Sequence, residues 1–418
     1  MARTVAEVPG GARVTDFISL GVISRRIPEA EVRRVLEETG RQSERQRKLP
    51  MRLMVYYVIA LALYMEVSYG EVLRCLLEGL DWLGVPVKSI RTVQKSSISR
   101  ARARLGVEPV QRLYEEVVEP VAAPATRGAW YRGRRLVSMD GSTLDVADTP
   151  ENEEAFGRPG APRGTAGFPK IRLVSLVENG THVLFGARHG PYRGSSEKKL
   201  AEKVVGNLRA DMLCLADRGF FSSALWKKAV ETGAELLWRV PNNVVLPCLE
   251  RMDDGSYTSK VYPSPRDRRQ DRGGLPVRVI EFKLEGLAQG GDGELYRVIT
   301  TLLDPEEAPA RELAALYHER WEIETAFDEL KIHLRGRAIV LRSRTPELVD
   351  QEFYGLLLAH FAVRDLMHEA ALGADLDPDE LSFVHAVRVV RRKLPRYTPF
   401  SPSGGSGSPP PGDPGRTP

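Results

Sequence analysis

Cysteine is scarce in this sequence, since its 418 residues include only Cys75, Cys214 and Cys248. The three lie far apart and form no C-x-x-C pair, which argues against a zinc finger and against a framework of disulfide bonds. The first residues also lack the basic-then-apolar order of a signal peptide. Both absences favour a reducing compartment, so we expect a cytoplasmic protein.

A long apolar run is also missing. The run that comes nearest, residues 53–65 (LMVYYVIALALYM), has 13 uncharged residues, whereas a membrane-spanning helix needs about 20. A buried helix is the better interpretation, and we expect no membrane partner. Charge of one sign is not in large excess either, because 60 Lys and Arg face 56 Asp and Glu. A nucleic-acid partner must therefore be argued from local clusters of charge.

The composition is that of a globular protein, with 42% hydrophobic and 28% charged residues, and the length suggests two or three domains. Helical patterns come first along the chain and predict an all-α domain. Strands joined through Asn179-Gly180 follow, and then strand–helix–strand units, which together predict a mixed α/β domain. The segments that we predict are a helical N-terminal domain (1–130), the first part of the α/β core (131–240), a β-rich insertion (241–308), C-terminal helices that complete the core (309–398) and a disordered Gly/Ser/Pro-rich tail (399–418).

The N-terminal domain has one local concentration of positive charge. Between Asp81 and Glu108 the sequence contains no acid, and Ser, Thr and Gln residues lie between the bases, which suits contacts with phosphates and base edges. We therefore predict a nucleic-acid-binding face, and a solvated helix face is the alternative. The bases that we single out are Arg91, Lys95, Arg100 and Arg102.

A polar stripe follows one face of the helix predicted over residues 309–334. At about 100° per residue, four side chains fall within about 60° of one another: Tyr317, Arg320, Glu324 and Lys331. Apolar residues gather on a neighbouring face, so the helix can dock while the stripe stays at the edge of the contact. A carboxylate between cations in such a place is typical of a functional site, although ordinary ion pairs along a helix explain the same pattern.

Two further acids follow apolar runs that predict strands. Asp140 precedes Gly141-Ser142, and Asp217 precedes Arg218-Gly219. We expect both acids at strand ends, where α/β sheets build their sites, and a turn-forming role is the alternative for either acid alone. With Glu324 they make a set of three carboxylates, which are the oxygen ligands that hard divalent cations prefer.

Three motifs together resemble the bacterial DDE transposases of the insertion-sequence-four family. They are Asp140-Gly141-Ser142, Asp217-Arg218-Gly219-Phe220 and Tyr317-x2-Arg320-x3-Glu324-x6-Lys331, the last of which matches that family's Y-R-E-K signature. The resemblance covers about residues 15–395. It implies a ribonuclease-H-like mixed-sheet catalytic core with Asp140 on the first strand, Asp217 after the fourth and Glu324 on a later helix.

The resemblance also implies an enzyme that cleaves the ends of an insertion sequence and joins them to target DNA. Asp140, Asp217 and Glu324 would hold two Mg²⁺ or Mn²⁺ ions for phosphoryl transfer. The implied route is cut-and-paste through a DNA hairpin. A homodimer would pair two terminal inverted repeats, and the protein would be associated with the nucleoid.

DNA contacts close to the reaction follow from the same resemblance. Tyr317, Arg320 and Lys331 would grip phosphates beside the scissile bond. Relatives stack an aromatic side chain on a flipped base, and here Tyr296 and Trp238 qualify by type, with core packing as the alternative for both. Two other functions stay open: a nuclease on the same core that does not join strands, and an inactive DNA-binding descendant.

Overall fold

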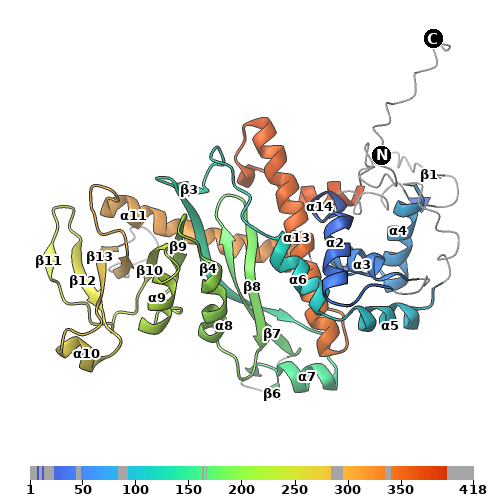
Figure 1. Ribbon diagram of the computed structural model, residues 1–418, viewed down its shortest axis with the longest axis horizontal. Helices are drawn as coiled ribbons and strands as arrows, with labels where there is room; N and C mark the ends of the chain where they lie inside the picture. The colour runs from blue at the N-terminus through green and yellow to red at the C-terminus, as the bar shows by residue number, and fades with distance from the viewer. Residues whose placement is uncertain are drawn as a thin grey trace, which may run out of the picture.

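The computed structural model describes residues 7–8, 12–13, 23–43, 49–82, 93–161, 164–165, 167–283, 295–334 and 340–392. Figure 1 shows a central sheet, with the N-terminal helices at one end of the molecule and the segment 241–308 at the other. Two predictions, the DNA contact of Arg91 and the disordered tail 399–418, lie outside the described residues.

The N-terminal region is helical, as its pattern predicts. Its helices are α2 (Glu29–Glu38), α3 (Met51–Leu63), α4 (Tyr69–Trp82), α5 (Lys95–Leu105) and α6 (Glu108–Val117). Helix α3 is apolar on all sides and is buried almost throughout, which explains the apolar run without a membrane. Helix α4 begins after Ser68, whose hydroxyl accepts the Glu71 N–H at 3.2 Å. Among the described residues, no helix combines the length and apolar character needed to cross a bilayer.

The centre of the α/β core is a mixed sheet of five strands. They are β4 (Arg134–Asp145), β7 (Lys170–Glu178), β8 (Val183–Pro191), β9 (Met212–Ala216) and β10 (Glu235–Arg239). β4, β7 and β8 pair antiparallel, whereas β9 is parallel to both β4 and β10. Helices α8 (Glu197–Val204) and α9 (Ser223–Val230) connect β8 to β9 and β9 to β10. This arrangement confirms the predicted α/β fold class with a ribonuclease-H-like core.

The segment 241–308 continues this sheet. β14 (Leu295–Thr300) pairs antiparallel with β10, and the sheet extends outward through β13 (Leu275–Lys283), β12 (Tyr257–Val261) and β11 (Glu250–Arg251). The result is one ten-stranded sheet in which β3 (Trp130–Tyr131) also pairs with β4. The shorter elements are β1 (Glu7–Val8), β2 (Ala12–Arg13), α7 (Pro150–Phe156), β5 (Gly160–Ala161), β6 (Gly164–Thr165), η2 (Val205–Asn207) and α10 (Pro265–Arg269).

The helix predicted over 309–334 is not continuous, which corrects the prediction. It consists of α11 (Ala310–Leu316), the 3₁₀ turn η3 (Tyr317–Trp321), α12 (Glu322–Asp328) and the π-helical segment η4 (Glu329–Leu334). Such irregular turns recur at functional sites. Here both contain side chains that are held by other elements, namely Arg320 in η3 and Glu329 in η4.

Helix α13 (Pro346–Ala374) lies between the N-terminal helices and the β8 edge of the sheet, and η5 (Pro378–Glu380) and α14 (Phe383–Arg392) follow it. It packs on α3 and α6 and also on β8, so a single apolar core runs from the N-terminal helices into the sheet (Figure 1). At Gly355 the backbone of α13 lies directly against Val58 of α3. A Cβ atom there would lie 2.8 Å from the Val58 carbonyl oxygen, so only glycine fits without a shift of backbone.

Gly355→Ala should therefore lower the free energy of unfolding by about 1–3 kcal/mol, the usual cost of overpacking, although alanine is the better helix former. Gly373→Ala is the matched control, because it lies in the same helix with nothing within 4 Å of the added methyl group. It should raise stability by about 0.5–1 kcal/mol. Urea unfolding monitored by circular dichroism measures both, and equal effects of the two substitutions would contradict the packing argument.

Candidate active site

Two acids meet where β9 ends. In the parallel pairing of β4 with β9, Met139 lies opposite Ala216, so the next residues, Asp140 and Asp217, are neighbours across the two strands. Asp217 follows the last residue of β9, as predicted. Asp140 was predicted at a strand end, and that prediction is wrong: β4 continues to Asp145 because its pairing with β7 extends that far.

Arg320 links the third acid to this pair. Its Nη1 lies 3.1 Å from Asp140 Oδ2, and its Nη2 lies 3.6 Å from Glu324 Oε1. The Arg320 side chain is only 10% exposed and that of Asp140 22%, whereas Glu324 is 48% exposed. The set is therefore buried on the strand side and open to solvent on the helix side.

Negative charge dominates the electrostatics of this cluster. The pKa of Asp140 is raised to about 6, chiefly by burial; the Gly141 N–H and Arg320 act to lower this pKa, and the charges of Asp217 and Glu197 act to raise it. Burial acts to lower the pKa of the Arg320 guanidinium, but the surrounding negative charges prevail and raise it. Crowded carboxylates that need a cation, with only oxygen donors, fit a hard divalent ion.

The two remaining residues of the stripe also contact these two strands. The buried Tyr317 hydroxyl donates to the Ala216 carbonyl oxygen at 3.4 Å. Lys331 Nζ donates to Ser142 Oγ at 3.0 Å. The four residues of the stripe therefore lie around Asp140 and Asp217, although the helix that carries them is irregular.

A fourth acid, Glu197, is absent from the sequence-based set. It is the first residue of α8, its carboxylate pairs with Arg172 at 2.9 Å, and its charge acts on Asp140. A Cβ atom on Gly141 would lie 2.8 Å from Glu197 Cγ, so the glycine of the first motif leaves room for this side chain. The only local signal is the Ser196 cap, which places a helix start but not the strand that it faces.

The two candidate stacking aromatics have different environments. Trp238 is fully buried and meets Trp226 edge-on, with 5.4 Å between ring centroids. Of the two roles left open for Trp238, base stacking and core packing, the structure shows core packing. Tyr296 is partly exposed, stacks on Phe282 and lies 3.9 Å beneath the Arg239 guanidinium. Its base-stacking role stays a prediction.

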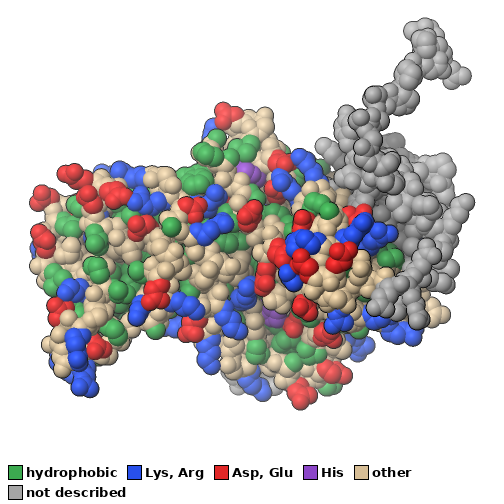
Figure 2. All heavy atoms as spheres, in the orientation of Figure 1, with side chains coloured by type: hydrophobic (Ala, Val, Ile, Leu, Met, Phe, Trp, Pro, Cys, Tyr) green, Lys and Arg blue, Asp and Glu red, His purple; other side chains and the backbone are tan. Residues whose placement is uncertain are grey.

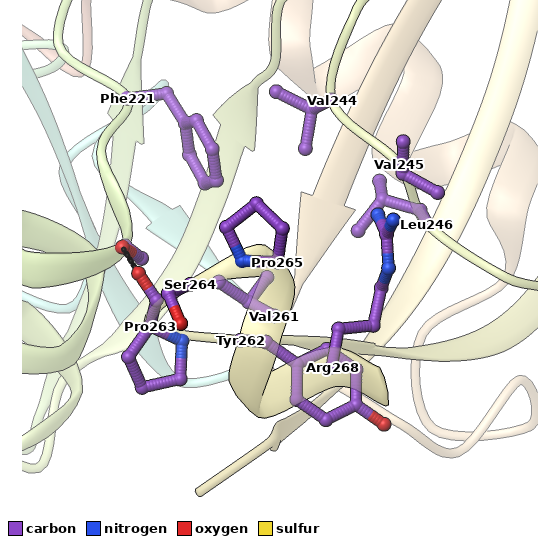
Figure 3. Close-up of a pocket in the computed structure, with 11 residues that line it drawn as sticks. Phe221, Val244, Val245, Leu246, Val261, Tyr262, Pro263, Ser264, Pro265 and Arg268 are labelled. Carbon is purple, nitrogen blue, oxygen red and sulfur yellow. Dashed lines mark hydrogen bonds between the residues drawn. The ribbon is translucent and has the colours of Figure 1, made fainter. Parts of the chain in front are cut away.

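A small pocket begins at Phe221, four residues beyond Asp217 (Figure 3). Its volume is about 180 Å³, whereas small-molecule sites usually enclose roughly 300–1,000 Å³. No carboxylate lines it, and Figure 3 shows Arg268 reaching toward Val245 and Leu246. Without a carboxylate the pocket is a poor site for a divalent cation, so the acid cluster is the better candidate for metal-dependent chemistry.

The predicted basic face of α5 is divided by the fold. Arg102 is 2% exposed, and its guanidinium donates to Gln351 Oε1 at 2.8 Å and to Ser343 Oγ at 3.0 Å. Its predicted DNA contact is wrong, because α5 packs toward α13 and this base bonds inward. Lys95 and Arg100 are exposed, and their DNA contacts stay predictions.

A buried ion pair between Glu329 of η4 and Arg364 of α13 connects the helical segment that follows α12 to the core. Glu329 is 4% exposed, and Arg364 Nε donates to its Oε2 at 2.7 Å. His182 Nδ1 and His360 Nε2 lie 3.2 and 3.4 Å from its oxygens. Burial alone would raise the pKa of Glu329, but the hydrogen bonds of the two histidines and the charge of Arg364 hold it well below its usual value.

The strand order β8-β7-β4-β9-β10 and the acid cluster are those of a ribonuclease-H-like protein. The irregular helical segment after α11 carries the Y-R-E-K residues. Two family patterns match the chain: "Insertion element 4 transposase N-terminal" over residues 17–115 and "Transposase DDE domain" over residues 131–362, more than half of the chain. The chain belongs to the DDE transposases of the insertion-sequence-four family, which confirms the resemblance.

Two relatives come from Escherichia coli (strain K12). Transposase InsG for insertion sequence element IS4 is 29% identical over 374 residues, which cover 89% of this chain and 82% of the relative. Putative transposase InsZ is 23% identical over 224 residues, or 53% of this chain and 72% of the relative. The first match extends over both the helical region and the sheet.

Glu329→Gln should destabilise the protein by about 3–5 kcal/mol at pH 7, because it leaves the Arg364 guanidinium buried without its counter-charge. The pKa of Glu329 is lowered on folding, so its contribution is present above its unfolded pKa and is lost as the pH falls through the folded value. The difference between the two proteins should therefore shrink below about pH 4.5.

Denaturant unfolding at several pH values measures this. The control is Asp328→Asn, which removes a charge one residue earlier on the exposed face of α12 and should change stability by less than about 0.5 kcal/mol. An equal, pH-independent loss in both variants would show that Glu329 does not act through its charge.

Proposed function

We propose that this transposase cleaves the ends of its insertion sequence and joins them to target DNA by two-metal phosphoryl transfer. One observation carries the proposal: Arg320 contacts both Asp140 and Glu324 at the point where Asp217 leaves β9. Acids distant in sequence thus share one cation within a partly buried cluster. The proposal includes a cut-and-paste route through a DNA hairpin and a homodimer that pairs two ends.

Asp140, Asp217 and Glu324 would hold Mg²⁺ or Mn²⁺, which supplies activation of the attacking oxygen and stabilisation of the leaving one. Partial burial of Asp140 strengthens its attraction for cations, because water screens the charge less. The 48% exposure of the Glu324 side chain leaves the helix side of the cluster accessible to DNA.

Arg320 and Lys331 would position the DNA backbone. Cations bound to the acids would neutralise the partners of Arg320, and its guanidinium would then be available to donate to a phosphate beside the site. Lys331, on Ser142 Oγ, offers a second charge next to Asp140. Further away, α10 carries the exposed Arg266 and Arg269, and Figure 2 shows basic side chains at the lower left of the molecule. Such a surface offers sequence-independent phosphate contacts to a long duplex.

Glu324→Gln and Asp217→Asn should each reduce Mg²⁺-dependent nicking of terminal-repeat DNA on the order of a hundredfold or more, because an amide cannot replace the charge of a metal-binding carboxylate. The control is Asp328→Asn on α12, whose carboxylate lies outside the cluster, and its activity should match the unmodified protein. Cleavage retained by Glu324→Gln would contradict the proposal.

The same assay separates the alternatives when a labelled target plasmid is added. Joined products support a transposase, and nicking without joining under the same conditions would indicate a nuclease on this core. Binding without either reaction would indicate an inactive DNA-binding descendant.

Lys95→Ala should flatten the salt dependence of DNA binding by about 0.9 in a plot of log affinity against log salt concentration, because one phosphate contact is lost. Fluorescence anisotropy measures the slope at salt concentrations from about 50 to 200 mM, a range over which the affinity of phosphate-contacting proteins for DNA changes strongly. Arg112→Ala is the control, since Glu38 and Glu116 already neutralise Arg112. Equal slopes for Lys95→Ala and the unmodified protein would indicate a merely solvated face.

A further inference from the structure

A second cluster of potential ligands lies on the opposite side of α12 from Arg320. His182, in the turn between β7 and β8, is 3% exposed. Its Nε2 lies 3.2 Å from Asp379 Oδ1 of η5 and 3.9 Å from Glu322 Oε2 of α12. Within the described chain, Nε2 has no aligned hydrogen-bond partner despite its burial, so the nitrogen points toward two carboxylates without donating to either.

The spacing of these atoms is that of ligands around one ion. One nitrogen and two carboxylate oxygens lie within 4.8 Å of one another. Ligands of a tetrahedral zinc ion, at about 2.0–2.1 Å from the metal, are about 3.3 Å apart. The observed distances of 3.2 and 3.9 Å therefore need only small side-chain movements to enclose a metal.

The charge of the surroundings also calls for a divalent cation. Arg364 balances Glu329 by a direct ion pair, and among the described residues neither Glu322 nor Asp379 forms an ion pair with a lysine or an arginine. A charge of two plus would neutralise both. Since burial of an unbalanced charge is costly, an ion of this charge would stabilise the folded cluster.

Outer contacts already orient two of the ligands, as in established metal sites. His182 Nδ1 lies 3.2 Å from Glu329 Oε1 and also contacts the Arg364 guanidinium, and these two contacts hold the ring with Nε2 toward the carboxylates. The Gly180 N–H donates to Glu322 Oε2 at 2.5 Å. The Asp379 side chain is 42% exposed, which gives an ion a path from solvent and leaves a position for water.

We propose that His182, Glu322 and Asp379 bind a divalent transition-metal ion of the zinc type, separate from the catalytic acids. An imidazole with two carboxylates suits zinc better than magnesium, which prefers oxygen ligands alone. The ion joins the β7–β8 turn, α12 and η5. Glu322 is the first residue of α12, and Glu324 follows two residues later. The bound ion would therefore also fix the start of the helix that carries Glu324.

The test uses the full chain with Asp140→Asn and Asp217→Asn, called the background protein below. These two substitutions remove two of the proposed catalytic metal ligands, so that metal binding at the second cluster is measured alone. After chelation and dialysis, Zn²⁺ is titrated by calorimetry, and Co²⁺ is added in parallel to record its visible absorption. The background protein should bind one Zn²⁺ per chain, melt at a higher temperature with the metal, and give the intense absorption of a low-coordinate Co²⁺ site.

Asp379→Asn in this background should weaken Zn²⁺ binding by at least about a hundredfold and abolish the shift in melting temperature. Asp375→Asn is the matched control on the same loop, because its side chain is 98% exposed, and it should bind like the background protein. His182→Asn, whose residue type tolerates the positive φ of 58° found there, should also lose the Co²⁺ absorption.

The proposal is overturned if the background protein binds no Zn²⁺, or if Asp379→Asn binds it as Asp375→Asn does. Should His182→Asn fail to fold, Asp379→Asn decides the question alone, since Asp379 is partly exposed and its amide keeps the shape of the side chain.

Discussion

The parallel register of β4 and β9 is the constraint on which the site depends. Met139 opposite Ala216 makes Asp140 and Asp217 neighbours, and a shift of one residue would turn one of them to the other face of the sheet. The Tyr317 hydroxyl meets the same strand at the Ala216 carbonyl. Strand pairing, rather than the helix, therefore determines where the acids gather, and the helix adds Glu324 to a pair that already exists.

Charge balance explains why the segment after α11 is irregular. On one side of α12, Arg320 bonds to the acids on the sheet, and on the other, Glu329 is drawn into the core by Arg364. A regular helix has a fixed angle between residues, so it cannot satisfy two such partners on separate elements without local tightening or widening. The 3₁₀ and π turns occur at these two residues. The buried network thus shapes the face that the site uses.

Sequence patterns predicted most elements and the principal acids. Alternating and apolar runs located β4, β7, β8, β9 and β10, and motif spacing singled out Asp140, Asp217 and Glu324. The errors concern residues whose role depends on distant partners. Arg102 looks like a solvated base in its own helix, but Gln351 and Ser343 bond it inside the protein. Trp238 has the residue type that could stack on a base, but its ring is fully buried and packs edge-on against Trp226.

The sequence by itself determined most of the helical and strand segments, the family and the choice of three candidate acids, because these follow from periodicity and from motifs read along the chain. Tertiary structure alone decided that Asp140 lies inside a long strand, that Glu197 faces it, and that His182 meets Glu322 and Asp379. Such neighbours are separated by tens to hundreds of residues, and no local pattern records them, because only strand register and helix packing bring them within a few ångströms.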